Sequence, residues 1–277
     1  YRQAIEKLAG KPPAEPPSGN RVVLCELFTS VRADPAIASE FSTAALQRRF
    51  GADRFIVVRF HPLAPAGRDT VGGDPLANGA SLTRLVYYQG LQVPQLWLDG
   101  IRHPDPEGLL ADLPSIHRYL STAVEKRLAS ESVWTLKLFA NESDGMLTVT
   151  AEATGKTPAT ESQRLRLLLV ESHVSMPRAV NGVRRQDMVV RAQLDDSDGV
   201  ESTDGVFAFD VQVKLDNIRK QLTDDLVRYE RRQGMEFAEK PLDLKGLHVV
   251  GFVQDNTTRE VLQAAIIKVT PKAKPSP

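Results

Sequence analysis

The pattern of hydrophobic and polar positions changes near residue 131. Before that point, short continuous apolar runs alternate with segments whose apolar residues recur at helical spacing. The runs predict strands at 22–28 and 54–60, and the segment between them predicts a helix at 35–50. A strand, a helix and a second strand in succession imply a parallel pair joined by a right-handed crossover.

The remainder of this first half continues the alternation of helix and strand. The stretch 61–79 is rich in glycine and proline, and a helix is predicted to follow it at 80–90. An apolar strand then begins at Pro94, where the missing N–H falls outside the ladder. The last helical pattern covers 106–130, and Pro114 is predicted to kink or divide that helix.

After residue 131 the period becomes that of β-strands. Apolar and polar residues alternate in "VWTLKLFAN" and "MLTVTAEAT", on either side of the turn signal "NESDG", and this pattern predicts a β-hairpin. Further apolar runs predict more strands, interrupted by a polar helical segment at 215–233. Mostly antiparallel strands at moderate spacing predict a β-sandwich.

The length of the chain, 277 residues, allows two domains with separate cores. We expect an N-terminal helical turn and a proline-rich linker at 1–20, followed by an α/β domain at 21–130. A β-sandwich-like domain is expected at 131–270, and a disordered tail at 271–277.

Charge and hydropathy restrict the classes of partner. Thirty-five basic residues balance thirty-five acidic ones, so the field of the whole chain gives no reason to expect nucleic acid or an anionic membrane as a partner. No apolar stretch reaches the length of a membrane-spanning helix. Because the chain begins at Tyr1 rather than at methionine, a signal or a membrane tether upstream of residue 1 stays open.

The single cysteine, Cys25, lies inside the first predicted strand. One cysteine cannot form an intrachain disulfide or a cysteine-rich zinc site. We expect Cys25 to be a small buried hydrophobic residue, with a reactive thiol as the alternative.

The order of elements and three sequence segments resemble a known family. The segments are "ELFTSVRADPA", "DPLANGASLTRLVYYQGLQVPQLWLDG" and "VVGFVQDNTTREVLQAA". They are similar to a group of uncharacterised and outer-membrane-associated bacterial thioredoxin-like proteins, and the resemblance covers about 21–269. It implies an α/β thioredoxin-like fold at 21–130, then a mostly antiparallel β-sandwich, in a bacterial protein of the periplasm or another extracytoplasmic compartment.

The chain departs from this family at the redox motif. After "ELFTS" the family usually has C-x-x-C, and its two cysteine positions are here Ala33 and Ala36, with Asp34 and Pro35 between them. Thiol-disulfide exchange needs one thiolate to attack and a second thiol to resolve the mixed disulfide, and alanine supplies neither. No catalytic residue of the motif is therefore intact, and no cofactor is expected.

Without the redox chemistry, the resemblance still implies a scaffold that binds a peptide. In thioredoxin-like proteins the bond matching Val93-Pro94 is cis and faces the motif, and extended peptides pair with the backbone beside it. The implied binding positions are Thr29, Ser30, Arg32, Val93 and Pro94. The implied partner is an extended peptide or a partner protein in the groove beside Pro94.

Two functions follow from this reading, and the sequence does not decide between them. The first is a redox-inactive thioredoxin-like binding or assembly module outside the cytoplasm. The second is a thiol-disulfide oxidoreductase whose cysteines at positions 33 and 36 were replaced. The alanines fit either history, loss in evolution or deliberate substitution, and loss in evolution is the favoured interpretation.

Polar residues near the strand ends are further candidates. His61 follows the strand 54–60, at the carboxyl end where sites in open α/β sheets tend to lie. A metal shared with Asp69 and Asp74 is one hypothesis, although the spacing matches no known metal site, and a loop histidine bonded to the backbone is favoured. Glu26 is interpreted as a strand residue facing solvent, with a buried proton-transfer carboxylate as the alternative.

Other histidines and arginines are expected at the surface. His103 and His117 are assigned to the surface of a turn and of a helix. One loop-rich stretch collects basic residues that suit an acidic partner, although a solvated face is the favoured interpretation. These residues are His173, Arg184, Arg185 and Arg191.

Overall fold

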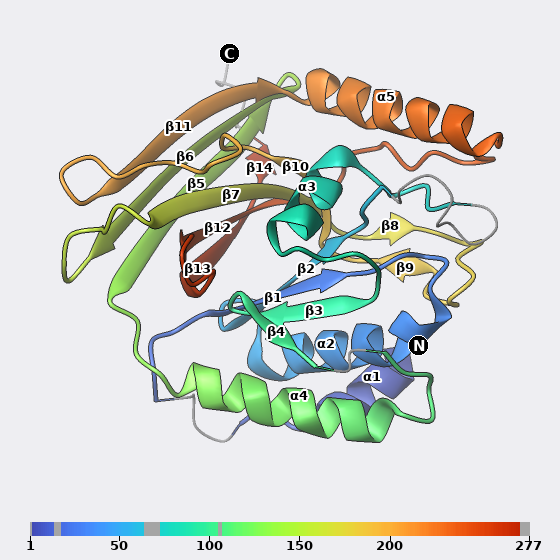
Figure 1. The fold of residues 1–277 in the computed structure, drawn as a ribbon, viewed down its shortest axis with the longest axis horizontal. Helices are drawn as coiled ribbons and strands as arrows, with labels where there is room; N and C mark the ends of the chain where they lie inside the picture. Colours follow the sequence, from blue (N-terminus) through green and yellow to red (C-terminus); the bar gives the residue numbers. More distant parts are fainter. Residues whose placement is uncertain (1, 14–17, 64–72, 105–106, 272–277) are drawn as a thin grey trace, which may run out of the picture.

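The computed structural model of the protein describes residues 2–13, 18–63, 73–104 and 107–271 (Figure 1). Its helices are α1 (Arg2–Ala9), η1 (Asp34–Ala36), α2 (Ile37–Phe50), α3 (Gly79–Tyr87), α4 (Leu113–Leu128) and α5 (Leu215–Gln233). Its longer strands are β1 (Val23–Phe28), β2 (Phe55–Phe60), β3 (Gln95–Leu98), β4 (Ile101–His103), β5 (Trp134–Ser143), β6 (Met146–Gly155), β7 (Gln163–Glu171), β10 (Val189–Gln193), β11 (Phe207–Lys214), β12 (Leu247–Asp255) and β13 (Val261–Lys268). Its shortest strands are β8 (Val174–Ser175), β9 (Arg185–Gln186) and β14 (Thr270–Pro271).

An eight-stranded sheet forms the centre of the molecule, in the order β13-β12-β7-β10-β2-β1-β3-β4. β1 and β2 pair in parallel with α2 between them in the chain, so the predicted strand, helix and strand are confirmed. β3 runs antiparallel to β1, and β4 runs antiparallel to β3. β1 and β2 are buried along their whole length because neighbouring strands and helices cover both of their faces.

The C-terminal strands continue this same sheet. β10 pairs in parallel with β2 through Val189 and Arg59, and β7, β12 and β13 follow in antiparallel pairing. A second sheet, in the order β11-β6-β5-β14, packs on them across an apolar core that includes Trp134, Leu167 and Val249. The two layers are mostly antiparallel, as expected, but one layer extends the first sheet instead of forming a separate one. The large sheet therefore crosses the domain boundary predicted near residue 131.

Helices cover the two faces of the large sheet near β1 and β2. α2 and α4 pack on one face over a core that includes Val23, Cys25 and Val57, and α1 packs on α2. α3 lies on the opposite face, where Phe28 and Phe60 stack with ring centroids 4.9 Å apart. Figure 1 shows α1, α2 and α4 together on one side and α3 on the other. The turn that follows β1 therefore lies where the sheet meets the start of α2.

The observed helix boundaries correct one prediction and confirm another. α4 begins at Leu113, so Pro114 lies in its first turn and starts the helix instead of kinking it. Proline suits this position because the N–H that it lacks would have no partner inside the helix. α5 occupies the predicted range and ends at Gly234, whose φ of 63° is the left-handed conformation common after a helix. No helix within the described ranges is both long and apolar enough to cross a membrane.

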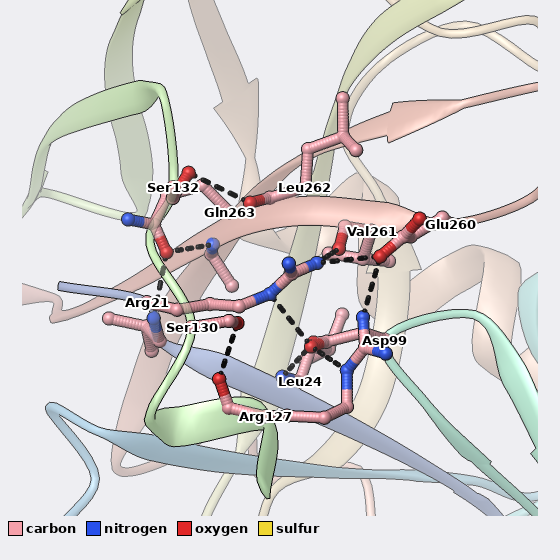
Figure 2. A network of polar contacts seen from close by, with 12 residues as sticks. Arg21, Leu24, Asp99, Arg127, Ser130, Ser132, Glu260, Val261, Leu262 and Gln263 are labelled. Carbon is pink, nitrogen blue, oxygen red and sulfur yellow. Dashed lines mark hydrogen bonds and ion pairs between the residues drawn. The ribbon is translucent and has the colours of Figure 1, made fainter. Parts of the chain in front are cut away.

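A network of charged residues near the start of β1 joins four segments (Figure 2). They are the residues before β1, the β3–β4 turn, α4 and the β12–β13 turn. Arg21 Nε donates to Asp99 Oδ2 over 3.0 Å, and Arg127 donates to Asp99 and, over 2.8 Å, to Glu260 Oε1. The other oxygen of Asp99 accepts from Leu24 N over 2.8 Å. Burial raises the pKa of Asp99, and the two arginines oppose that rise. The network ties α4 and the β3–β4 turn to the β12–β13 hairpin.

Candidate functional site

The turn between β1 and α2 is the candidate site, and alanine occupies positions 33 and 36. The 3₁₀-helix η1 leads directly into α2, and its proline lies in the first turn. Ala33 is half-buried with extended backbone angles, φ −92° and ψ 95°. Asp34 is exposed, whereas Ala36 is fully buried. The segment 33–36 therefore offers backbone groups and one exposed carboxylate, and no thiol.

Hydrogen bonds hold this turn from two sides. Val31 N donates to Asp74 Oδ2 over 3.1 Å, which links the turn to the segment before α3. On the side of β10, Asn181 N donates to Val31 O and Asn181 Nδ2 donates to Ser30 O, each over 3.1 Å. The Ser30 hydroxyl accepts from Arg32 N over 3.1 Å. The loop that contains Asn181 belongs to the C-terminal half, so both halves of the chain shape the turn.

Pro94 lies on the remaining side of the turn. The β1–β3 register pairs Phe28 with Gln95, so the next residue along each strand places Pro94 opposite Thr29. The Val93–Pro94 peptide bond is cis. Thr29 and Pro94 are buried, and the preceding Val93 is half-buried. The structure thus brings Pro94 next to the first residue of the turn, on the side opposite Asn181.

A buried histidine–aspartate pair lies beneath the turn. His61 is fully buried, and its Nδ1 lies 2.8 Å from Asp74 Oδ2. Asp74 also accepts from Leu76 N over 2.9 Å, besides its bond to Val31. Burial alone would raise the pKa of Asp74, but His61 and these N–H donors lower it, so the carboxylate is ionised at neutral pH. The favoured interpretation of His61 as a loop histidine bonded to the backbone is therefore wrong.

The metal hypothesis gains no support from this pair. Asp69 lies outside the described residues, and the part of the chain that the structure describes contains no group of three or more histidine, cysteine, aspartate or glutamate residues arranged to hold a metal. Asp74 is already occupied by His61 and two backbone donors. The pair is instead a buried hydrogen bond between His61 Nδ1 and Asp74 Oδ2, and the second ring nitrogen of His61, Nε2, has no hydrogen-bond partner among the described residues.

Several buried polar atoms of the described residues have no hydrogen-bond partner, and three of them lie beside the turn on the α2 face of the sheet. They are His61 Nε2, Thr29 Oγ1 and Glu40 Oε1. Thr29 N bonds to Phe60 O over 2.9 Å, which continues the parallel register and places Thr29 beside His61. Glu40 bonds to Arg59 Nε over 2.6 Å with its other oxygen. Similar atoms occur elsewhere in the described chain, including Trp97 Nε1 and Tyr229 OH, so it is their position beside the turn that distinguishes these three.

Glu26 lies on the opposite face and is fully satisfied. Its carboxylate accepts from Arg84 Nε over 2.7 Å, from Arg84 Nη2 over 3.0 Å and from the Tyr88 hydroxyl. Gln254 Oε1 accepts from Arg84 Nη1 over 2.8 Å, and burial raises the pKa of Tyr88. The favoured interpretation of Glu26 as a solvent-facing residue is wrong, since the residue is completely buried. Its bidentate bond to Arg84 holds it as a structural anion.

The one thiol of the chain is not part of the site. Cys25 is free and fully buried on the face of β1 covered by α2 and α4. Burial raises its pKa far above the ordinary value for a thiol. Because the thiolate is the reactive form, Cys25 behaves as the small buried hydrophobic residue that was expected.

The basic stretch of the second half divides into two environments. Arg191 is buried and bonds to Glu171 Oε2 over 2.7 Å, so it is not part of any surface. His173 and Arg185 are exposed and lie 3.5 and 3.3 Å from the Asp187 carboxylate. The favoured interpretation as a solvated face therefore holds for the exposed His173, Arg184 and Arg185 and is wrong for Arg191, and the alternative of one basic surface for an acidic partner loses Arg191.

The two histidines expected at the surface differ from each other. His103 is buried, and its ring meets Tyr119 edge to face with centroids 4.5 Å apart. His117 is half-buried, and its burial lowers its pKa together with nearby Arg49. The surface assignment was therefore wrong for His103.

Comparisons with known proteins identify a shared fold. No protein-family model and no curated protein sequence matches the chain. HBP35 of Porphyromonas gingivalis is similar in structure over 94% of this chain and 80% of that chain, with a TM-score of 0.61 and 13% sequence identity. A domain of the outer membrane lipoprotein Omp28 from the same organism covers 51% of this chain and 92% of that chain, with a TM-score of 0.28 and 17% identity. The first likeness shows that this chain and HBP35 have a common fold.

Proposed function

We propose that the protein is a binding or assembly module built on a thioredoxin-like fold without redox cysteines. It takes an extended segment of a peptide or partner protein along the turn after β1, beside Pro94. The observation that carries the proposal is the turn itself. The start of α2 and Pro94 border it, while Ala33 and Ala36 stand where the resembling family has cysteines.

The arrangement of the first half supports the thioredoxin-like interpretation. β1 and β2 are parallel, β3 and β4 follow on the other side of β1 in antiparallel pairing, and α2 and α4 cover one face. α3 covers the other face. The fold shared with HBP35 covers 94% of the chain, so the combination of both halves occurs in a second protein.

Exposed apolar side chains on two loops support a binding role. Leu91 is 71% exposed and lies just before Pro94 in the chain. Leu109 and Leu110 are 54% and 57% exposed in the loop before α4. That loop reaches the start of α2, where Gly108 O accepts from Ala38 N over 3.1 Å. Apolar residues exposed near one site are typical of surfaces that bind proteins.

The test uses reduced and alkylated insulin B chain as an extended polypeptide probe. We expect fluorescence anisotropy to show that it binds the protein, and that Ala33→Trp weakens binding at least about tenfold because the indole fills the space above the turn. Ala208→Trp on the exposed part of β11 is the matched control and should leave binding unchanged. Equal binding by wild type and Ala33→Trp would refute the role of the turn.

The alternative function is a thiol-disulfide oxidoreductase whose two cysteines were replaced. The favourable observation is that the rest of the turn is intact, with a helix start and a histidine–aspartate pair beneath it. The test is the double variant Ala33→Cys/Ala36→Cys in an insulin reduction assay. Turnover would favour the alternative, and the absence of turnover in a folded double variant would favour the binding module.

We also propose that the protein acts outside the cytoplasm of a bacterium. The support is the resemblance of its motif segments to outer-membrane-associated thioredoxin-like proteins. Fractionation of the source cells, with detection by antibodies raised against this chain, is the test. Recovery in the cytoplasmic fraction would contradict the proposal.

A further inference from the structure

β4 leaves one edge of the large sheet open. It is the last strand in the sheet order, so its outer side has no strand partner among the residues that the structure describes. Asp99 and Gly100 have φ values of 46° and 76°, which is the type I′ geometry of a two-residue hairpin. Leu98 and Ile101 are then the hydrogen-bonded pair. The backbone N–H and C=O of the next residue, Arg102, therefore point away from β3, toward the open edge.

A groove runs between this edge and α4. Its volume is about 440 Å³, and α4 lines it with Tyr119, Ala123 and Lys126, which lie on one face of the helix at i, i+4 and i+7. β4 contributes Ile101. Ile101 and Tyr119 are 52% and 55% exposed, so the groove presents apolar surface to solvent directly beside an open strand.

The free charge of the groove is positive. Lys126 lines it from α4, and Arg102 lies at the open strand, with its side chain on the opposite face of β4 because it pairs with Trp97. Neither residue forms an ion pair within the described ranges. Arg127 at the inner end is bonded to Asp99 and Glu260 (Figure 2), so the charges there are already compensated. Carboxylates of an occupant would pair with these unpaired positive side chains, whereas a basic occupant would be repelled.

We propose that this groove receives an extended acidic segment of a partner protein, which adds to β4 as a further strand. The segment bonds to the outward N–H and C=O of Arg102, places apolar side chains on Ile101 and Tyr119 on the α4 side, and brings carboxylates to Arg102 on the other side of the strand. Strand addition supplies affinity through the backbone and specificity through alternate side chains. This surface lies along the outer edge of β4 and is separate from the turn after β1.

A second copy of this chain does not fit the same edge. Two β4 edges related by a two-fold axis would place the central residue of each strand, Arg102, beside its own copy. Like charges opposite each other across antiparallel strands are destabilising. The charge of the groove therefore favours a different, acidic partner.

The experiment uses two labelled synthetic peptides, one of alternating glutamate and valine and one with lysine in place of every glutamate. We expect anisotropy titrations of the full chain to show binding of the acidic peptide only. Arg102→Glu should weaken that binding at least about tenfold, because the glutamates of the bound strand face Arg102. Lys214→Glu, which makes the same charge change at an exposed position before α5, should leave it unchanged. The turn variant Ala33→Trp should also bind the acidic peptide normally, which separates this proposal from the function of the turn.

Amide hydrogen exchange provides the readout that is specific for strand addition. We expect the Arg102 amide to exchange more slowly when the acidic peptide is bound, because its N–H gains a partner. Equal binding of both peptides, or binding without protection of Arg102, would overturn the proposal. Concentration-dependent dimerisation in sedimentation experiments that Arg102→Glu abolishes would overturn the choice of partner.

Discussion

Two buried polar clusters lie on opposite faces of β1 and β2, and they differ in how completely their hydrogen bonds are made. On the α3 face, the carboxylate of Glu26 is bonded by Arg84 and Tyr88, and Gln254 takes a further N–H of the guanidinium. On the α2 face, His61 and Thr29 each keep a buried polar atom without a partner. The first cluster is closed, and the second is open at the side of the turn.

The difference indicates different roles. A closed buried network fixes one arrangement of the elements around it, because every member is costly to move or remove. A buried polar atom without a partner loses its hydrogen bonds to water on folding and gains none in return. Such an atom therefore does not stabilise the fold. The closed cluster thus holds α3 and β12 to β1, while the open cluster belongs to the turn where binding is proposed.

The largest effect is expected in the closed cluster. Glu26→Gln removes the negative charge while keeping the shape, and it leaves the Arg84 guanidinium buried without its counter-ion. We expect the free energy of unfolding to fall by about 3–5 kcal/mol. Urea unfolding followed by circular dichroism measures the change.

The control for this substitution is Glu152→Gln. Glu152 pairs with Lys137 at 3.6 Å, and both side chains are more than half exposed. The expected change is within about 0.5 kcal/mol, because exposed ion pairs contribute little. A loss below about 1 kcal/mol for Glu26→Gln would show that the closed cluster does not stabilise the fold as argued.

The sequence predicts the elements around these clusters better than their contacts. Continuous apolar runs at 22–28 and 54–60 were enough to predict β1, β2 and their parallel pairing. The extension of the sheet from β2 to β10 was not predicted, because it depends on a short pairing between distant segments. The predicted kink at Pro114 failed because local proline chemistry allows both a helix break and a helix start.

The polar partners were missed for a related reason. Glu26 lies in a strand that is buried on both faces, but only the position of Arg84 in space shows that its charge is compensated. His61 and Asp74 are separated by a loop rich in glycine and proline, whose path the sequence does not fix. The sequence did contain a hint in both cases, because Glu26 lies inside an apolar strand and His61 directly follows one. A polar residue at such a position needs a buried partner.

A moderate effect is expected from the His61–Asp74 pair. Asp74→Asn weakens the bonds to His61 Nδ1 and to two backbone N–H groups, and should lower the free energy of unfolding by about 1–3 kcal/mol at pH 7. The pKa of Asp74 in the folded state lies below its ordinary value of 3.8. The stabilisation by its charge is therefore present above pH 3.8 and is lost as the pH falls below that value, through the folded-state pKa.

Urea unfolding at a series of pH values checks this linkage. The difference between wild type and Asp74→Asn should shrink as the pH falls below 3.8. Asp210→Asn, at an exposed position of β11, should behave like wild type at every pH. A difference that is constant down to the acid transition would mean that the Asp74 charge contributes nothing.

The smallest effect, and the most direct test of the comparison, comes from removing one hydroxyl from each cluster. Thr29→Val replaces a buried hydroxyl that has no partner, so the free energy of unfolding should stay the same or rise by up to about 1 kcal/mol. Tyr88→Phe removes a hydroxyl that bonds to Glu26 and Arg84, and should cost about 1–2 kcal/mol. If one cluster is open and the other closed, Tyr88→Phe therefore lowers the urea midpoint, whereas Thr29→Val leaves it unchanged or raises it. A loss of equal size for both would show that Thr29 also has a hydrogen-bond partner in solution, and the distinction between the clusters would fail.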